Sequence, residues 1–426
     1  MKAFAAFAEK RRRPRFFAAG VLVLLLMAVG LWGFLRTRQT SSLLAWGTPA
    51  ERASLARLLG EFERRHWRVN IALETSGDAE SAAAILMERA KEGRAPDAAL
   101  VRAEDLDALL AADALQPVVV DEGEAVGQIT ALRSAFERNG KTWGVPFGWS
   151  VLMLYYDRGL FEARGIPIPR DFWDWGDLLA AAQALTQHDA EGKRARRYGL
   201  ALEGAAGEIA AFLWQNRGQI ADETGRWTFT DPRYVQSNAE ALRFYASLVG
   251  VHRVAPPPDS RGALALFASK KTAMAIGPRH WASDLDGAPG LDWDIAPLPK
   301  GREPATCLEV YGCGVPRGAR HAGTGTRLAT FLARETSQAV LAAHGGMAPA
   351  RVSLLGSRVF LDFPPRRPAR NDALARSLPF ARTLSFGPHS REAAALLADE
   401  ARALMTNPSA SVRVALERLQ TKLEAH

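Results

Sequence analysis

Hydrophobic and polar positions along the first hundred residues alternate with the periods of strands and helices in turn. Leu43 to Trp46 predicts a first strand, and leucines at helical spacing follow Thr48, the expected N-cap of a first helix. Val69 to Leu73 predicts a second strand, residues 81–91 a second amphipathic helix, and Ala98 to Val101 a third strand. This βαβαβ order predicts a mostly parallel sheet covered by helices on both faces, with its ligand site at the carboxyl ends of the strands.

The middle of the chain changes character at Lys141 to Tyr156, an aromatic and strand-like stretch that is interrupted by Pro146. We expect the chain to pass there from one lobe to another. Helical periodicity returns later, and one of the helices has Asp231 as its expected cap. The further helices are expected at residues 157–165, 174–186, 233–248, 262–268, 327–334, 337–344 and 392–405.

Before this pattern begins, Phe16 to Leu35 forms a run of 20 residues without a charge. As a helix it would span about 30 Å, the thickness of a hydrocarbon core. A cleaved signal peptide has a shorter apolar region and small residues at its cleavage site, so we predict an uncleaved membrane anchor. The basic cluster Lys10 to Arg15 outweighs Arg36 and Arg38. The N-terminus is therefore expected in the cytoplasm, and the remainder in the periplasm or outside the cell.

The net charge of the chain comes almost entirely from the predicted anchor and the residues on either side of it. Residues 1–38 hold eight lysines and arginines against Glu9 alone, which accounts for +7 of the total of +8. The rest of the 426 residues is nearly neutral and ordinary in composition, with 48% hydrophobic residues. The sequence therefore predicts a globular part with no nucleic-acid partner.

The only two cysteines, Cys307 and Cys313, are expected to be free and partly buried thiols. If residues 306–315 form one strand, the two lie about 20 Å apart, beyond the reach of a disulfide. No further ligands stand at zinc spacing, so neither a metal nor a cofactor is expected. Because there is no cysteine at the end of the apolar segment, the lipid attachment of many bacterial binding proteins is not expected either.

Five stretches of the chain, in order, resemble the maltose-binding-protein-like family, the family 1 extracellular solute-binding proteins of ABC importers. The densest is Gly144 to Phe161, which is similar to the family's "PxxxxxxxLYYNxxLF" hinge. The others are the "GIPxPxxW"-like run at 165–186, the "FxxGKxAMxxxG"-like segment at 267–277, the "PLPxG"-like strand at 294–301 and the "GGxxPxR"-like segment at 345–351. The resemblance covers Leu43 to the C-terminus.

This resemblance implies an α/β fold of two lobes, the type II periplasmic-binding-protein fold, preceded by one transmembrane helix. The expected order is a cytoplasmic N-terminus (1–15), an anchor (16–35), a spacer (36–42), an N-lobe (43–147 plus 308–346) and a C-lobe (152–306 plus 350–426). The chain would cross between the lobes three times, near 147–152, 307–312 and 346–350. The implied function is to bind a sugar or oligosaccharide between the lobes and deliver it to the permease subunits of an ABC importer.

A sugar-binding cleft needs flat aromatic side chains for the apolar ring faces and polar groups for the hydroxyls. Arg279 stands where the family often has an aromatic residue, and its guanidinium would favour an acidic or phosphorylated ligand. The candidate ligand-binding residues are Trp46, Thr48, Asp97, Trp149, Arg279, Trp281, Tyr311 and Phe386.

Several of these residues also have structural roles that would suffice. Thr48 is needed as a helix cap, Trp281 could pack in the core, and Tyr311 could pack against the hinge. Glu104, near the third strand, is more simply a solvated residue of a turn. The structural role and the ligand-binding role therefore remain open for each.

An enzyme is the rival class, and the motifs that catalysis requires are missing. The sequence contains no HExxH, GxxxxGK[ST] or GxSxG motif. The aspartates between 284 and 294 are dense enough to imitate the carboxylate pair of a glycosidase but lack regular calcium-ligand spacing. No catalytic residue is therefore expected, and the alternatives are a membrane-anchored ligand sensor and an extracellular glycoside hydrolase.

Overall fold

The computed structural model describes residues 25, 27 and 38–425, apart from 121, 122, 124, 125, 172, 190, 192–194, 223, 259, 260, 345 and 363–369. The expected anchor at residues 16–35 therefore lies outside the described residues, except for two positions. Among the residues that are described, no helix is long and apolar enough to cross a membrane.

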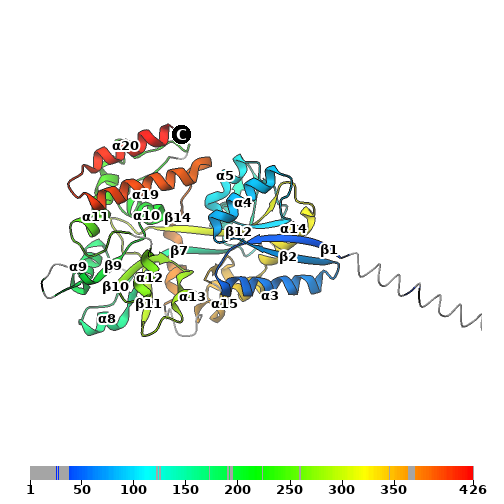
Figure 1. Ribbon diagram of the computed structural model, residues 1–426, viewed down its shortest axis with the longest axis horizontal. Coiled ribbons are helices and arrows are strands. Elements are labelled where there is room, and N and C mark those ends of the chain that lie inside the picture. Colours follow the sequence, from blue (N-terminus) through cyan, green and yellow to red (C-terminus); the bar gives the residue numbers. More distant parts are fainter. Residues whose placement is uncertain are drawn as a thin grey trace, which may run out of the picture.

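The N-lobe is built on the predicted βαβαβ unit (Figure 1). β1, β2 and β3 are parallel, with β1 in the middle, and Gln39 stands beside Val69 at the start of the first two strands. β1 begins four residues before the predicted Leu43, because its polar start pairs with β2 along the whole strand. The elements are β1 (Gln39–Ala45), α3 (Pro49–Arg65), β2 (Val69–Thr75), α4 (Ala79–Lys91) and β3 (Ala98–Arg102).

Two long strands, β7 (Val145–Asp157) and β12 (Thr306–Pro316), join the lobes (Figure 1). β12 pairs with β3 on one side and β7 on the other, and β7 continues to β10 and β11 of the C-lobe. The short strand β13 (Ala348–Pro349) also pairs with β7, close to the third expected crossing. The two-lobe α/β fold is thus present, while the exact lobe boundaries given above stay a prediction.

The C-lobe surrounds the other half of this sheet with helices (Figure 1). β9 runs parallel to β10, and β10 antiparallel to β7. Its elements are α8 (Arg158–Ala163), α9 (Trp175–Leu185), β8 (Gln187–His188), β9 (Ala195–Ala201), α10 (Ala206–Gln215), α11 (Val235–Gly250), α12 (Gly262–Ala268), β10 (Thr272–Pro278), α13 (Trp281–Leu285), β11 (Trp293–Pro297), α19 (Ser390–Thr406) and α20 (Val412–Glu424).

Shorter elements complete the two lobes and their connections. They are η1 (Ala103–Asp105), α5 (Leu106–Ala111), β4 (Leu115–Gln116), α7 (Thr130–Ser134), β5 (Glu137–Arg138), β6 (Lys141–Thr142), α14 (Ala322–Leu332), α15 (Glu335–His344), α16 (Val352–Leu355), α17 (Arg358–Leu361), α18 (Asp372–Ser377), η2 (Leu378–Phe380), β14 (Ala381–Thr383) and η3 (Gly387–His389). Cys307 and Cys313 both lie on β12 as buried free thiols, as predicted.

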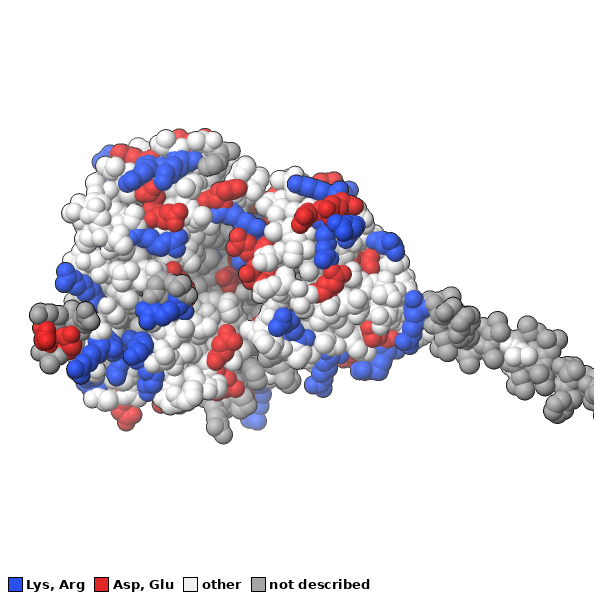
Figure 2. Space-filling model, viewed as in Figure 1, with Lys and Arg blue, Asp and Glu red and all other residues white. Residues whose placement is uncertain are grey.

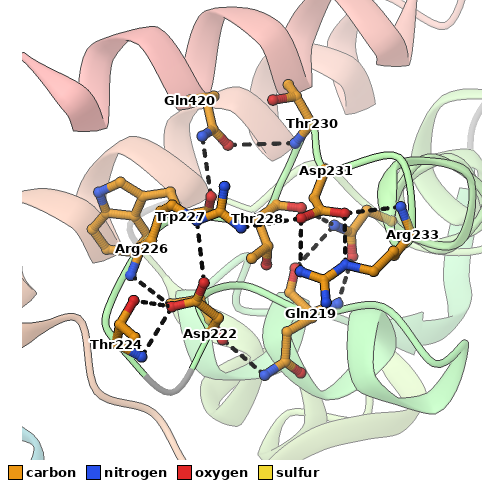
Figure 3. A network of polar contacts seen from close by, with 12 residues as sticks. Gln219, Asp222, Thr224, Arg226, Trp227, Thr228, Thr230, Asp231, Arg233 and Gln420 are labelled. Carbon is orange, nitrogen blue, oxygen red and sulfur yellow. Dashed lines mark hydrogen bonds and ion pairs between the residues drawn. The ribbon is translucent and has the colours of Figure 1, made fainter.

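The predicted cap of α11 is wrong, because this helix begins at Val235 and Asp231 is used in the preceding loop. The Asp231 carboxylate accepts hydrogen bonds from the backbone and guanidinium of Arg233, which hold the pKa of Asp231 at about 2 (Figure 3). Gln420 of α20 ties this loop down through Thr230 (Figure 3). The polar residues at the expected helix start therefore stabilise the loop that precedes α11.

A buried carboxyl group in the C-lobe makes stability depend on pH. Burial raises the pKa of Glu208 from 4.5 to about 7, although the Tyr245 hydroxyl and the backbone N–H groups of Glu203 and Gly204 donate to it. The pKa of Glu208 is higher in the folded protein than in the unfolded chain. The protonated carboxyl group therefore stabilises the fold fully at a pH below the unfolded pKa, and this contribution is lost as the pH rises through the folded pKa.

We expect the unfolding free energy of the wild type, relative to Glu208→Gln, to fall by about 3 kcal/mol between pH 4 and pH 8. The glutamine cannot ionise, so the variant lacks this contribution to the pH profile. Denaturant unfolding of both proteins at a series of pH values measures the difference. Parallel profiles would show that Glu208 does not titrate in this range.

Candidate functional site

A cavity of about 590 Å³ lies between the two lobes. It is lined from the carboxyl ends of β1, β2 and β3, from α13 of the C-lobe and from the strand β12 that joins the lobes. Figure 2 shows a hollow between the lobes with acidic side chains around it. We call it the Trp46 chamber; its lining is Trp46, Gly47, Thr48, Glu51, Gly77, Asp78, Ala79, Glu80, Arg102, His280, Asp284, Glu309, Tyr311 and Met347.

The structure brings three of the predicted ligand residues together in this chamber. Trp46 follows the end of β1, and its ring centroid lies 6.3 Å from that of Tyr311 on β12. Thr48 lines the chamber and also caps α3 in a capping box, in which Glu51 accepts from the Thr48 backbone at 2.8 Å. The Tyr311 hydroxyl donates to Glu309 at 2.6 Å. Two aromatic faces are thus held beside carboxylate acceptors.

The charges on the chamber wall are mostly negative. Five carboxylates line it, against Arg102 and His280 among the described residues. Arg102 is already neutralised, since it contacts Asp105 at 2.9 Å and Glu104 at 3.5 Å. Asp284 is partly buried, and this burial raises the pKa of its carboxyl group. A wall of this kind accepts hydrogen bonds from hydroxyl groups and repels anions.

The Glu104 carboxylate lies 3.5 Å from the guanidinium of Arg102. Burial raises the pKa of Glu104; Arg102 opposes this effect, whereas Glu309 adds to it. The expectation of a solvated residue does not hold for Glu104, because its side chain is only 17% exposed.

Three other candidates, Trp149, Arg279 and Trp281, lie in the packed interior, outside the described lining of the Trp46 chamber. Trp149 is fully buried and donates from Nε1 to the Pro349 carbonyl at 2.8 Å, which fastens β13 to β7. Arg279 is 1% exposed, and burial lowers its pKa. The Trp281 ring packs 5.5 Å from the ring of Tyr155. In this arrangement Arg279 is not placed to meet an anionic group in the cavity.

Asp97 lies at the other end of the N-lobe sheet. It precedes β3, and its carboxylate accepts from the backbone N–H groups of Ser42 at 3.1 Å and His321 at 2.6 Å. It therefore ties the start of α14 to the strands, far along β3 from the carboxyl ends that line the chamber.

A second cavity of about 910 Å³ lies between α5 of the N-lobe and the loops of the C-lobe. Phe386, the last predicted residue, lines it with its ring 5.6 Å from that of Trp227. We call this cavity the Phe386 chamber. Its wall also includes Asp107, Arg138, Trp214 and Arg382, so it carries both aromatic and charged groups.

The lobes touch each other at two contacts, one in the wall of the Phe386 chamber and one at Glu80 of the Trp46 chamber. Ser385 donates to Asp107 at 2.8 Å, and the Arg391 guanidinium of α19 donates to the Glu80 carbonyl at 2.6 Å. Both hydrogen bonds connect the C-lobe to the N-lobe, so the lobes are held together in the structure. We call the Arg391–Glu80 contact the interlobe bridge.

Most of the polar residues of the Trp46 chamber were not among the candidates predicted from the sequence. Asp78 and Glu80 could have been found because they follow the carboxyl end of β2, and Arg102 because it is the last residue of β3. Glu309 could have been found as well, since it is two residues before Tyr311 and shares a face of β12 with it. His280 and Asp284 carry no such signal, because a short helix places them.

Two sheet-based lobes joined by shared strands, with a cavity lined from both, define the chain as a solute-binding protein. The family of bacterial extracellular solute-binding proteins matches residues 58–358, and the chain belongs to this family. This agrees with the resemblance found in the sequence.

Putative binding proteins of Brucella abortus and Brucella suis are 27% identical over 182 residues, which is 41% of this chain. The match spans only 41% of the length of those relatives.

Solved structures match almost the whole chain. An ABC substrate-binding protein of Listeria monocytogenes in complex with cycloalternan has a TM-score of 0.80 at 20% identity, covering 91% of this chain and 98% of that one. A maltose-bound T. maritima protein has a TM-score of 0.77 at 18% identity, covering 91% and 99%. UgpB from Mycobacterium tuberculosis with glycerophosphocholine has a TM-score of 0.76 at 18% identity, covering 90% and 97%. At these identities the likeness shows the fold.

Proposed function

We propose that this chain binds a carbohydrate in the Trp46 chamber, closes its two lobes around it and delivers it unaltered to an ABC importer. The main support for this proposal is that residues of both lobes, and of the strand β12 that joins them, form the wall of the chamber. A solute bound there contacts both halves at once, so it has more contacts in the closed form than in the open one. Only this difference in affinity can favour closure.

The chemistry of the wall supports a hydroxyl-rich ligand. Trp46 and Tyr311 offer flat apolar faces, and Glu51, Glu309 and Asp284 offer acceptors for hydroxyl groups. The similar Listeria and T. maritima proteins were solved with cycloalternan and maltose. Because the wall is negatively charged, we propose a ligand without an acidic or phosphate group, in place of the acidic ligand that Arg279 suggested.

We further propose that the apolar run at 16–35 anchors the chain in the cytoplasmic membrane and leaves the binding lobes outside. The length of this run and the basic cluster before it support this part of the proposal. An anchor also raises the local concentration of the binding protein beside a permease in the same membrane. That a permease is the partner of this chain is proposed from its family membership.

The proposal predicts a thermal shift with neutral sugars. The full chain in detergent is screened by tryptophan fluorescence against neutral mono- and oligosaccharides, sugar acids and glycerol phosphates. A ligand at about 100 times its Kd should stabilise by about 2.7 kcal/mol, and we expect this only for neutral compounds. A response confined to anions would contradict the assignment of the ligand.

Analysis of the same mixtures after long incubation separates the alternatives. A glycoside hydrolase would yield shortened products, whereas a binding protein returns the sugar unchanged. Uptake by cells that lack the gene distinguishes transport from sensing. Loss of uptake supports the importer role, and uptake that persists with a changed transcriptional response supports a sensor.

A further inference from the structure

Basic side chains gather on the edge of the N-lobe where β1 begins (Figure 2). An exposed tryptophan, Trp67, lies among them in the turn after α3. α3 ends at this edge, and the turn that follows it leads into β2, whose first residue stands beside Gln39. The Gln39 N–H donates to the Arg68 carbonyl at 2.7 Å, so the turn lies against the start of the first strand. We call this surface the strand-start rim; it consists of Arg38, Arg64, Arg65, Trp67 and Arg68, all exposed.

The fold itself explains only part of this composition. Arg64 and Arg65 lie in the last turn of α3, where cations are favourable beside the carbonyl end of a helix. Trp67 follows the end of α3 and is 45% exposed. The Arg68 guanidinium lies 4.6 Å from its ring centroid. Tryptophan and arginine side chains both serve as anchors at the boundary between a membrane and water.

The length of chain before β1 places this edge close to the proposed anchor. The uncharged run ends at Leu35, and only Arg36, Thr37 and Arg38 separate it from Gln39. Even fully extended, the four steps from Leu35 to Gln39 reach about 14 Å. The start of β1 must therefore lie near the lipid headgroups if residues 16–35 span the membrane. The Debye length at physiological salt is about 8 Å, so the charges of this edge attract the headgroups when the linker is less than fully extended and the edge comes within that distance.

We propose that the strand-start rim is a membrane-docking surface that binds anionic lipid headgroups. The arginines supply the attraction to phosphate, and Trp67 supplies an amphipathic ring for the headgroup region. Docking fixes the direction of the N-lobe, with the starts of its parallel strands toward the bilayer and the Trp46 chamber at their far ends. This inference rests on the anchor in the proposed function and is independent of the ligand.

The test uses the full chain in vesicles. Because Cys307 and Cys313 are buried, a fluorophore on Asn70→Cys, an exposed residue next to the rim, reports its distance from an acceptor on the lipid headgroups. Energy transfer is compared in phosphatidylcholine alone and with about 30% phosphatidylglycerol. We expect at least about a twofold rise with the anionic lipid, and its loss in about 0.5 M salt.

Three variants decide whether the rim is responsible. Changing Arg64, Arg65 and Arg68 together to Gln should remove the rise, whereas changing the same three to Lys should keep most of it. The matched control Arg402→Gln with Arg413→Gln removes exposed charges from α19 and α20 in the other lobe and should change nothing.

Vesicle flotation of each protein reports the anchor separately. If the chains float but show equal energy transfer in both lipids, docking by the strand-start rim is refuted, whereas the membrane anchor is still supported. A rise that persists in the triple Gln variant would overturn the rim as well. Chains that fail to float would overturn the anchor and, with it, this docking.

Discussion

Replacing Gly346 with alanine should lower affinity for the proposed carbohydrate ligand by at least about 100-fold, because it keeps the lobes apart. Gly346 lies in the third expected crossing, and its N–H donates to Glu51 of the N-lobe at 3.2 Å. A methyl group on Gly346 would stand 2.3 Å from the Cα atom of His280 in the C-lobe. Backbone atoms cannot rotate out of the way, so the third crossing and α13 must separate.

Affinity by calorimetry and the radius of gyration by small-angle scattering, each with and without sugar, measure this effect. The control is Gly323→Ala, where no atom lies within 4 Å of the added carbon. It should bind and compact like the wild type. If Gly346→Ala also did so, closure would not depend on this contact.

The second large effect is expected for Trp46→Ala, which should weaken sugar binding by roughly 30-fold, or about 2 kcal/mol. Trp46 contributes one of the two aromatic faces of its chamber, and its removal leaves Tyr311 without its neighbour. The folded state should change little, because Trp46 is only partly buried and caps no helix. Calorimetry on the variant gives the affinity, and thermal unfolding without ligand gives the stability.

Two matched tryptophans complete this experiment. Trp67→Ala removes an exposed ring from the strand-start rim and should leave affinity unchanged in detergent. Trp227→Ala removes a ring from the Phe386 chamber. If Trp227→Ala weakened binding and Trp46→Ala did not, the sugar would belong in the larger chamber.

Local patterns predicted the residues at strand ends well. The end of β1 is marked by a hydrophobic run followed by a helix cap, so Trp46 and Thr48 could be placed at the carboxyl edge of the sheet. The family resemblance placed Tyr311 at a crossing, and the structure sets it on the chamber wall. In these cases the residue lies on a recognisable strand or within a few residues of its end, so its place in the sequence determines its place in the fold.

The same reasoning failed where both faces of an element are covered. β7 is buried along all of its 13 residues, so no alternation separates the residues that face a cavity from those that face the core. Trp149 therefore could not be distinguished as a packing residue. Asp97 was chosen as a candidate ligand residue, but it stands at the amino end of β3, whereas ligand sites gather at carboxyl ends.

The interlobe bridge sets a condition on the length of the sugar. Glu80 lines the Trp46 chamber, and Arg391 stands between His389 and Glu392, which line the Phe386 chamber. A mono- or disaccharide can fill one chamber while this hydrogen bond stays in place. We expect a longer saccharide that extends from one chamber to the other to displace this hydrogen bond and to compensate for the loss with its own hydroxyls. For the proposed carbohydrate, we therefore expect short saccharides to bind with the Arg391 contact intact and longer ones to bind only after it has broken.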